Sequence, residues 1–236
     1  MAEENPGVGS GILGMFNAFV DPAGLAKAAK AKLFWLWPLI VFLIVFIVVG
    51  YLMLPYTTQL MDAKLAERSM PPEQLENMKA TMHKFAPVGV FINPIVIVLI
   101  IMLCAWLVSV VGSMLGVRAK FRDVFSISMA CSLIGCLQYI AGYIVVRIKG
   151  DEIVNQDQLT PAFGLDIFIP AHGVSLAILN FFSIFQIWSL VIFALAVACL
   201  AGVSKGKAFA AITPAWVVPL IVRVVIAALS GGGSSS

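Results

Sequence analysis

Two long apolar segments joined by a short basic turn constrain this chain more than any other feature of its sequence. The segments are residues 88–115 and 125–146, and the turn carries four charges, on Arg118, Lys120, Arg122 and Asp123. An α-helix rises about 1.5 Å per residue, so roughly 20 apolar residues cross a hydrocarbon core of about 30 Å. Charges cannot lie in lipid between two such helices. The sequence therefore predicts a membrane hairpin whose turn lies at a membrane face.

Three more apolar segments of similar length occur in the chain. Hydrophobic residues make up 61% of the sequence and charged residues 11%, whereas soluble domains carry about 25% charged residues. The predicted fold class is all-α, a polytopic membrane helix bundle with five transmembrane helices. The expected spans are 33–54, 88–115, 125–146, 176–201 and 208–229, which together form one transmembrane domain at 33–229. A cytoplasmic or interfacial lead-in is expected at 1–32 and a flexible tail at 230–236.

The distribution of charge predicts the orientation of the spans. The lead-in and the two short basic turns contain eight Lys and Arg residues, while the two longer connections contain six over far more residues. Eight of the twelve acidic residues lie in those longer connections. The positive-inside rule then places the amino terminus in the cytoplasm and, after five crossings, the carboxyl terminus outside. The net charge of +3 is small and unevenly placed, so nucleic acid is not an expected partner.

The lead-in has its own helical signals. Apolar residues at helical spacing precede Asp21 and Pro22, which predict an N-cap and the first turn of a second short helix. Lysines at 27, 30 and 32 follow. This segment is expected either to lie on the membrane or to dock on the helix bundle, and the sequence does not favour one over the other.

Prolines and glycines predict where other elements begin and end. Segment 55–87 is expected to be extramembrane, with a separate amphipathic helix that starts at Pro71-Pro72-Glu73. Pro214 and Pro219 are expected to break the last span. Two short basic turns both begin with Gly-Val, which suggests that the second and third spans are repeated by the fourth and fifth.

Small residues recur at helical spacing along both arms of the hairpin. Because lipid is as apolar as Leu, membrane helices associate through close backbone approach, which small side chains permit. We interpret the stripes as helix-packing seams rather than as the lining of a substrate path. The seam residues are Ala105, Ser109, Gly112 and Gly116 in the first arm and Ser128, Ser132, Gly135 and Gly142 in the second.

Five polar residues in the spans are candidates for an intramembrane polar site: Asn93, Gln138, Asn180, Gln186 and Arg223. A charge at mid-membrane costs roughly 2.5 to 3.5 kcal/mol, so Arg223 is the costly member of the set. Two roles stay open for it. One is snorkelling or an ion pair with an outer-loop acid such as Asp166, and the other is binding of a lipid headgroup or an anionic solute. The amides are expected to hydrogen-bond between helices more often than to bind solute.

Groups that carry catalysis are sparse. The sequence contains no His-Glu-x-x-His or Gly-x-Ser-x-Gly motif, and no paired aspartates lie in a span. The four cysteines lie in apolar segments without metal-type spacing, and His83 and His172 lie in connections far apart in the sequence. The sequence predicts no catalytic residue, no metal site and no cofactor, and therefore no enzyme.

Four stretches together resemble the bacterial branch of the Yip domain family, the Ypt-interacting membrane proteins. They are Phe19-Val20-Asp21-Pro22, Met70-Pro71-Pro72-Glu73-Gln74-Leu75-Glu76, the Gly-bearing turn after the second span, and Phe182-Ser183-Ile184-Phe185-Gln186-Ile187-Trp188. The resemblance covers nearly the whole chain and implies five membrane helices with a cytoplasmic amino terminus. Eukaryotic relatives act with Rab-type GTPases, but their tripeptide motifs and long amino-terminal arm are not present here. A GTPase-binding role is therefore not expected.

Two classes of function follow from these observations. The first is a non-enzymatic integral membrane protein that organises membrane or partner proteins, and the alternative is a small permease or channel for a solute or lipid. A continuous cavity lined by the polar residues of the spans would favour the alternative. Expected partners are membrane lipids and either another membrane protein or a second copy of the chain. The expected location is the cytoplasmic (inner) membrane.

Overall fold

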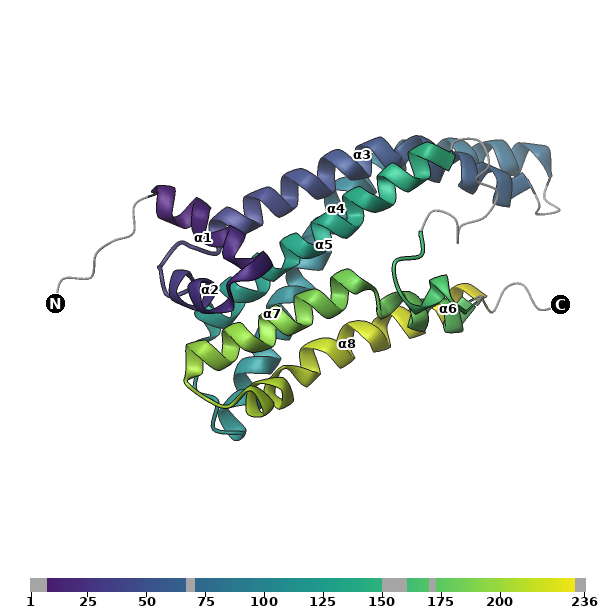
Figure 1. Ribbon diagram of the computed structural model, residues 1–236. Helices are drawn as coiled ribbons and strands as arrows, with labels where there is room; N and C mark the ends of the chain where they lie inside the picture. Colours follow the sequence, from purple (N-terminus) through teal and green to yellow (C-terminus); the bar gives the residue numbers. More distant parts are fainter. Residues whose placement is uncertain (1–7, 67–70, 150–160, 170–172, 232–236) are drawn as a thin grey trace. The chain divides into compact units, whose positions relative to one another are not determined.

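The computed structural model describes residues 8–66, 71–149, 161–169 and 173–231, and within these ranges every regular element is a helix (Figure 1). The helices are α1 (Val8–Val20), α2 (Pro22–Ala28), α3 (Leu36–Ala66), α4 (Pro72–Met114), α5 (Phe121–Lys149), α6 (Gly173–Phe181), α7 (Ile184–Ala201) and α8 (Lys205–Gly231), with a 3₁₀ helix, η3, at Leu165–Ile167. Met70, His172, the tail after residue 231 and most of the acidic loop lie outside the described residues.

The chain divides into two compact units. Unit 1 comprises Met1–Phe42, Val98–Gly135 and Ala162–Ser236, and unit 2 comprises Leu43–Ile97 and Cys136–Pro161. Helices α3, α4 and α5 each contribute residues to both units.

The prediction of five apolar spanning helices is confirmed. Helices α3, α4, α5, α7 and α8 are each long and apolar enough to cross a bilayer. A bilayer leaves no water for unpaired backbone groups, which a continuous helix satisfies internally.

The amphipathic helix expected after Pro71 is not separate from the second span. The helix begins at Pro72 with Glu73 in its first turn, as predicted, but it continues through Pro87 and Pro94 to Met114, over 43 residues. Helix α3 likewise runs to Ala66, well past the expected end of the first span. A proline removes one backbone hydrogen bond and bends a helix, but it does not end a helix whose flanking residues continue the helical pattern.

The last two spans also differ from expectation. Residues 176–201 do not form one helix, because α6 ends at Phe181 and α7 begins at Ile184. The Ser183 hydroxyl caps α7 by accepting from the Gln186 amide at 3.2 Å, and the Ile184 amide donates to the Phe163 carbonyl at 3.0 Å. These bonds give hydrogen-bond partners to two backbone amides that the break leaves unpaired at the start of α7. Helix α8, in contrast, is continuous across Pro214 and Pro219, so the expected break there is wrong.

The two Gly-Val turns share one capping geometry. Gly116 and Gly202 have φ of 77° and 64°, a left-handed conformation that glycine adopts without steric cost. The amide of Val117 donates to the Gly112 carbonyl at 2.7 Å, and the amide of Val203 donates to the Ala198 carbonyl at 3.1 Å. Both are the six-to-one bonds of a Schellman cap. The two turns therefore repeat each other in local structure as well as in sequence.

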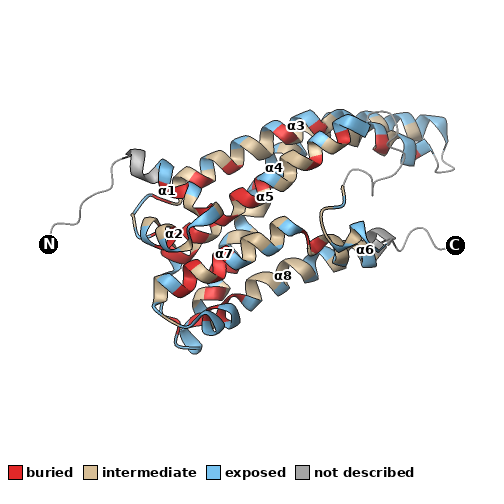
Figure 2. Ribbon diagram, viewed as in Figure 1, coloured by how far each residue is buried: buried red, intermediate tan, exposed pale blue. Residues whose placement is uncertain are grey.

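The lead-in docks on α7 within unit 1. Asp21 caps α2 by accepting from the Gly24 amide at 2.9 Å, as predicted. The indole Nε1–H of Trp188 in α7 donates to the Phe19 carbonyl at 2.9 Å. Figure 2 shows buried positions along α2 and α7. Leu25 of α2 has no exposed surface. The lead-in therefore docks on α7, and its position relative to the membrane stays a prediction.

Candidate functional site

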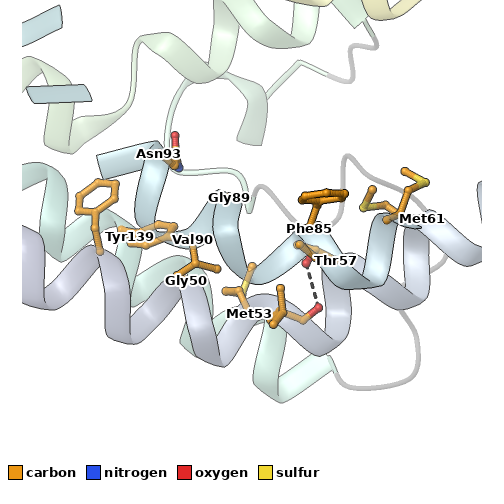
Figure 3. A pocket seen from close by; sticks show the side chains of 13 residues that line it. Gly50, Met53, Thr57, Met61, Phe85, Gly89, Val90, Asn93 and Tyr139 are labelled. Carbon is orange, nitrogen blue, oxygen red and sulfur yellow. Dashed lines mark hydrogen bonds between the residues drawn. The ribbon is translucent and has the colours of Figure 1, made fainter. Parts of the chain in front are cut away.

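An apolar groove runs along α3 and α4 within unit 2 (Figure 3). Its volume is about 560 Å³, which lies in the range of roughly 300 to 1,000 Å³ typical of ligand pockets. It is lined by Phe46, Gly50, Met53, Leu54, Thr57 and Met61 of α3, by Met82, Phe85, Ala86, Gly89, Val90 and Asn93 of α4, and by Tyr139 of α5.

Two contacts join α3 to α4 along the groove. Gly50 allows close approach, since a Cβ there would lie 3.1 Å from Cγ1 of Val90. Farther along, the Nε2–H of His83 donates to both carboxylate oxygens of Asp62, at 3.0 and 2.9 Å. Gly89 is different, because a Cβ there would meet nothing within 4 Å. The helices are therefore in close contact at Gly50 and leave open space at Gly89.

The lining combines a fixed end with adaptable side chains. The ring of Tyr139 stacks on that of Phe46, with centroids 4.6 Å apart and planes 17° apart. Figure 3 shows Met53 and Val90 between Tyr139 at one end of the groove and Met61 at the other. Three of the lining residues are methionines, whose flexible, polarisable side chains adapt to ligands of different shape.

Polar groups in the groove are few. The Thr57 hydroxyl already donates to the Leu54 carbonyl at 2.9 Å, and the amide of Asn93 is exposed. Across the described residues, no three His, Cys, Asp or Glu side chains lie together in a way that could hold a metal ion. The groove can therefore hold an apolar chain or helix by van der Waals packing, and it offers little for acid–base or metal chemistry.

The five candidate polar residues are divided between the two units. Asn93 lines the groove, and Gln138 is half-buried on α5 in the same unit. The other three belong to unit 1. There, the amide of Asn180 donates to Asp166 at 3.0 Å, and Gln186 lies in the first turn of α7. A role for the set as a polar site stays a prediction.

The remaining member of that set, Arg223, lies against an aromatic cluster of unit 1. Its guanidinium carbon is 5.5 Å from the centroid of the Phe181 ring. Phe181 and Phe182 both make edge contacts with Trp216 of α8, at centroid distances of 5.2 and 5.3 Å. Asp166, the acid considered for Arg223, instead accepts from the amides of Asn180 and Gly164.

One contact joins the first small-residue stripe to α8, and another joins a neighbour of the second stripe to α7. A Cβ on Gly112 would lie 3.6 Å from the Cβ of Ala211 in α8. The hydroxyl of Ser189 in α7 donates to the carbonyl of Cys131, which lies beside the second stripe, at 3.4 Å. A Cβ on Gly135 would meet nothing within 4 Å. The seam role of the stripes stays a prediction.

The other stripe residues mostly make local contacts. Ser109, Ser128 and Ser132 donate to backbone carbonyls within their own helices. Ala105 and Gly142 are buried, and Gly116 forms the cap of α4.

Sequence reasoning missed the groove because it divided the chain at Pro87. The sequence pattern places Met82 and Phe85 in an expected extramembrane helix and Gly89 and Asn93 in an expected span. The spacing of these four residues follows one helical face without interruption. That continuity across the proline is the signal that could have revealed the groove.

Comparisons with known proteins match most of the chain. The family model described as the Yip1 domain matches residues 16–227. "Membrane protein YknW" of Bacillus subtilis (strain 168) is 26% identical over 206 residues, which is 86% of this chain and 85% of that protein. No solved structure gives a significant match.

Proposed function

Because the chain belongs to the Yip1 domain family, we propose that it is a non-enzymatic membrane protein that organises partner membrane proteins by holding an apolar helix of the partner in the α3–α4 groove. The family resemblance expected from the sequence is confirmed, and the chain is a multi-pass helical membrane protein. Members of this family are generally non-enzymatic. The observation that carries the proposal is the methionine-lined groove of about 560 Å³.

The length of the groove favours a helix over a lipid tail. Its lining extends along α3 from Phe46 to Met61, about 22 Å at 1.5 Å per residue. The first span is expected to leave the hydrocarbon near Leu54, so an occupant that fills the groove must continue beyond the end of the acyl chains. A partner helix does this, and an acyl chain stops at the headgroup.

The proposal includes an orientation and a location. The positive-inside rule supports a cytoplasmic end that contains the lead-in and the two Gly-Val turns, and it supports placement in the cytoplasmic membrane. The groove would then open in the outer half of the bilayer and at its outer face.

The permease or channel alternative has less support. It needs polar side chains that face a solute path. The Asn180 amide donates to Asp166, and the guanidinium of Arg223 lies over the Phe181 ring. These two groups therefore have partners within the chain.

Site-specific photo-crosslinking in native membranes tests the proposal. A benzophenone amino acid placed at Asn93 lies in the groove lining, and the same residue placed at Ile95 lies at similar depth on an exposed part of α4 outside that lining. We expect a discrete protein adduct from position 93 and not from position 95. Gly89→Leu should abolish that adduct, because its side chain fills open space in the groove.

The identity of the adduct separates the alternatives. An adduct with a second copy would identify a homo-oligomer, and an adduct with lipid alone would overturn the partner-protein proposal. Equal crosslinking from positions 93 and 95 would show that the groove is not a specific site.

A further inference from the structure

Helix α1 has apolar side chains on two opposite faces. One face carries Met15 and Ala18, which are buried against the rest of the lead-in and α7. The opposite face carries Leu13, Phe16 and Val20, which are 70%, 52% and 81% exposed. At 100° per residue these three fall within one narrow arc of the helix. A docked helix with a second apolar face requires a second apolar environment.

Basic residues from three segments lie at the same end of unit 1 as the lead-in. Nη2 of Arg122, at the start of α5, donates to the Lys30 carbonyl at 3.0 Å, which joins the α4–α5 turn to the lead-in. Nζ of Lys207 lies 3.8 Å from the position of a Cβ on Gly116, which brings the start of α8 to the same turn. The cations of this end are Lys27, Lys30, Lys32, Arg118, Lys120, Arg122, Lys205 and Lys207.

The acids described at this end do not neutralise the cluster. Asp21 accepts from the Gly24 amide as the cap of α2. Asp123 is buried and pairs with Arg122 at 3.0 Å. The other seven basic residues of the cluster form no ion pair with a carboxylate within the part of the chain that the structure describes, and all seven are exposed.

We propose that the exposed face of α1 and this basic cluster form a binding surface for anionic lipid headgroups of the membrane that the protein spans. Leu13, Phe16 and Val20 enter the boundary between headgroups and acyl chains, while the lysines of the lead-in contact the phosphates. Each Lys or Arg near an anionic surface adds attraction, and apolar side chains add burial. The inference rests on the proposed orientation and is independent of the groove.

Charge complementarity favours lipid over a protein partner. The surface combines a narrow apolar stripe with unpaired cations spread over three segments, which suits a continuous layer of negative charge. A protein interface core is typically depleted in lysine.

Nitroxide accessibility in nanodiscs tests this surface. The full chain, with its four cysteines replaced by alanine, carries a spin label at position 13, and a control carries it at Glu76, an exposed position of α4. Discs contain phosphatidylcholine alone or an equimolar mixture with phosphatidylglycerol. We expect the label at position 13 to be accessible to oxygen and shielded from a water-soluble nickel reagent, most strongly in the anionic discs. The label at position 76 should contact nickel in both.

Replacing the lysines of the lead-in tests whether their charge, in addition to the apolar face of α1, contributes to lipid binding. Lys27→Gln/Lys30→Gln/Lys32→Gln should shift the position-13 label toward water in anionic discs by about fivefold for each lysine removed. Nickel access at position 13 in both lipids would overturn the proposal, as would equal shielding with and without phosphatidylglycerol. A label shielded from oxygen and nickel alike would indicate a protein cover and would also overturn it. None of these results bears on crosslinking at Asn93, so the two proposals fail separately.

Discussion

The guanidinium of Arg223 in α8 lies over the ring of Phe181 at the end of α6, with 5.5 Å between its central carbon and the ring centroid. Phe181 is 2% exposed and is held in edge contact with Trp216. A cation over an aromatic face is attracted by the ring quadrupole, and the attraction grows where water is excluded. The charge that costs most to place in the membrane therefore has a partner that the sequence analysis did not consider.

A double-mutant cycle measures this contact. Arg223→Leu and Phe181→Leu each remove one partner, and the coupling between them should stabilise the protein by about 0.5 to 2 kcal/mol. Arg223→Lys should lose only part of this energy, because an ammonium still interacts with the ring but does not stack. Thermal unfolding in detergent gives the four stabilities. A coupling near zero would return Arg223 to the snorkelling or lipid-binding roles.

Gly112 is crowded and Gly135 is not, so replacing each by leucine should have opposite effects. Gly112→Leu should destabilise the protein by about 1 to 3 kcal/mol, because its side chain must displace Val117 and Ala211. Gly135→Leu should be neutral or stabilising, since its surroundings are open and Gly costs about 1 kcal/mol in a helix relative to Ala. Melting temperatures in detergent check the pair. Equal losses at both positions would contradict the geometry.

The number and type of the spanning helices could be predicted from sequence because they depend on local properties. Hydropathy over 20 residues decides whether a segment can cross a bilayer, and charge decides where a turn can lie. The Asp21 cap was predictable for the same reason, since it involves only neighbouring residues.

Helix continuity was less predictable, because it depends on contacts between distant segments. Pro87 and Pro94 look like breaks in the sequence but lie inside α4, while Phe182 and Ser183 look continuous but separate α6 from α7. The break at Ser183 is stabilised by the Phe163 carbonyl, 21 positions from Ile184 along the chain. No local sequence pattern predicts the hydrogen bond between these two residues. The groove was missed for a related reason, since its two walls belong to different helices.

The hydrogen bond from Trp188 predicts how firmly the lead-in is held. Trp188→Phe keeps the aromatic contact with Phe19 but removes the donor to its carbonyl, at a cost of about 0.5 to 1.5 kcal/mol. Residues 8–20 should then exchange amide hydrogen faster, by up to about tenfold. Trp106→Phe is the matched control, because Trp106 is exposed on α4. Unchanged exchange in Trp188→Phe would show that packing alone holds the lead-in.

Cysteine accessibility tests the orientation. With the native cysteines replaced by alanine, a single cysteine at Arg118 should react with a membrane-impermeant maleimide only after the cells are opened. A cysteine at Glu76 should react in intact cells, since α4 separates the two positions by a full span. Labelling of both from the same side would refute the predicted topology.

The two glycines of the groove separate its structure from its binding role. Gly50→Leu must push against Val90 and the Tyr139 hydroxyl, which would lie 3.1 and 3.5 Å from the first added carbon. We expect it to force α3 from α4 and to lower stability by about 1 to 3 kcal/mol. Gly89→Leu meets open space, so it should leave the melting temperature unchanged or raise it. Its side chain nevertheless occupies the volume that a partner helix would fill. Loss of the position-93 adduct in a Gly89→Leu protein of normal stability would therefore report on binding, whereas an unchanged adduct would place the partner elsewhere.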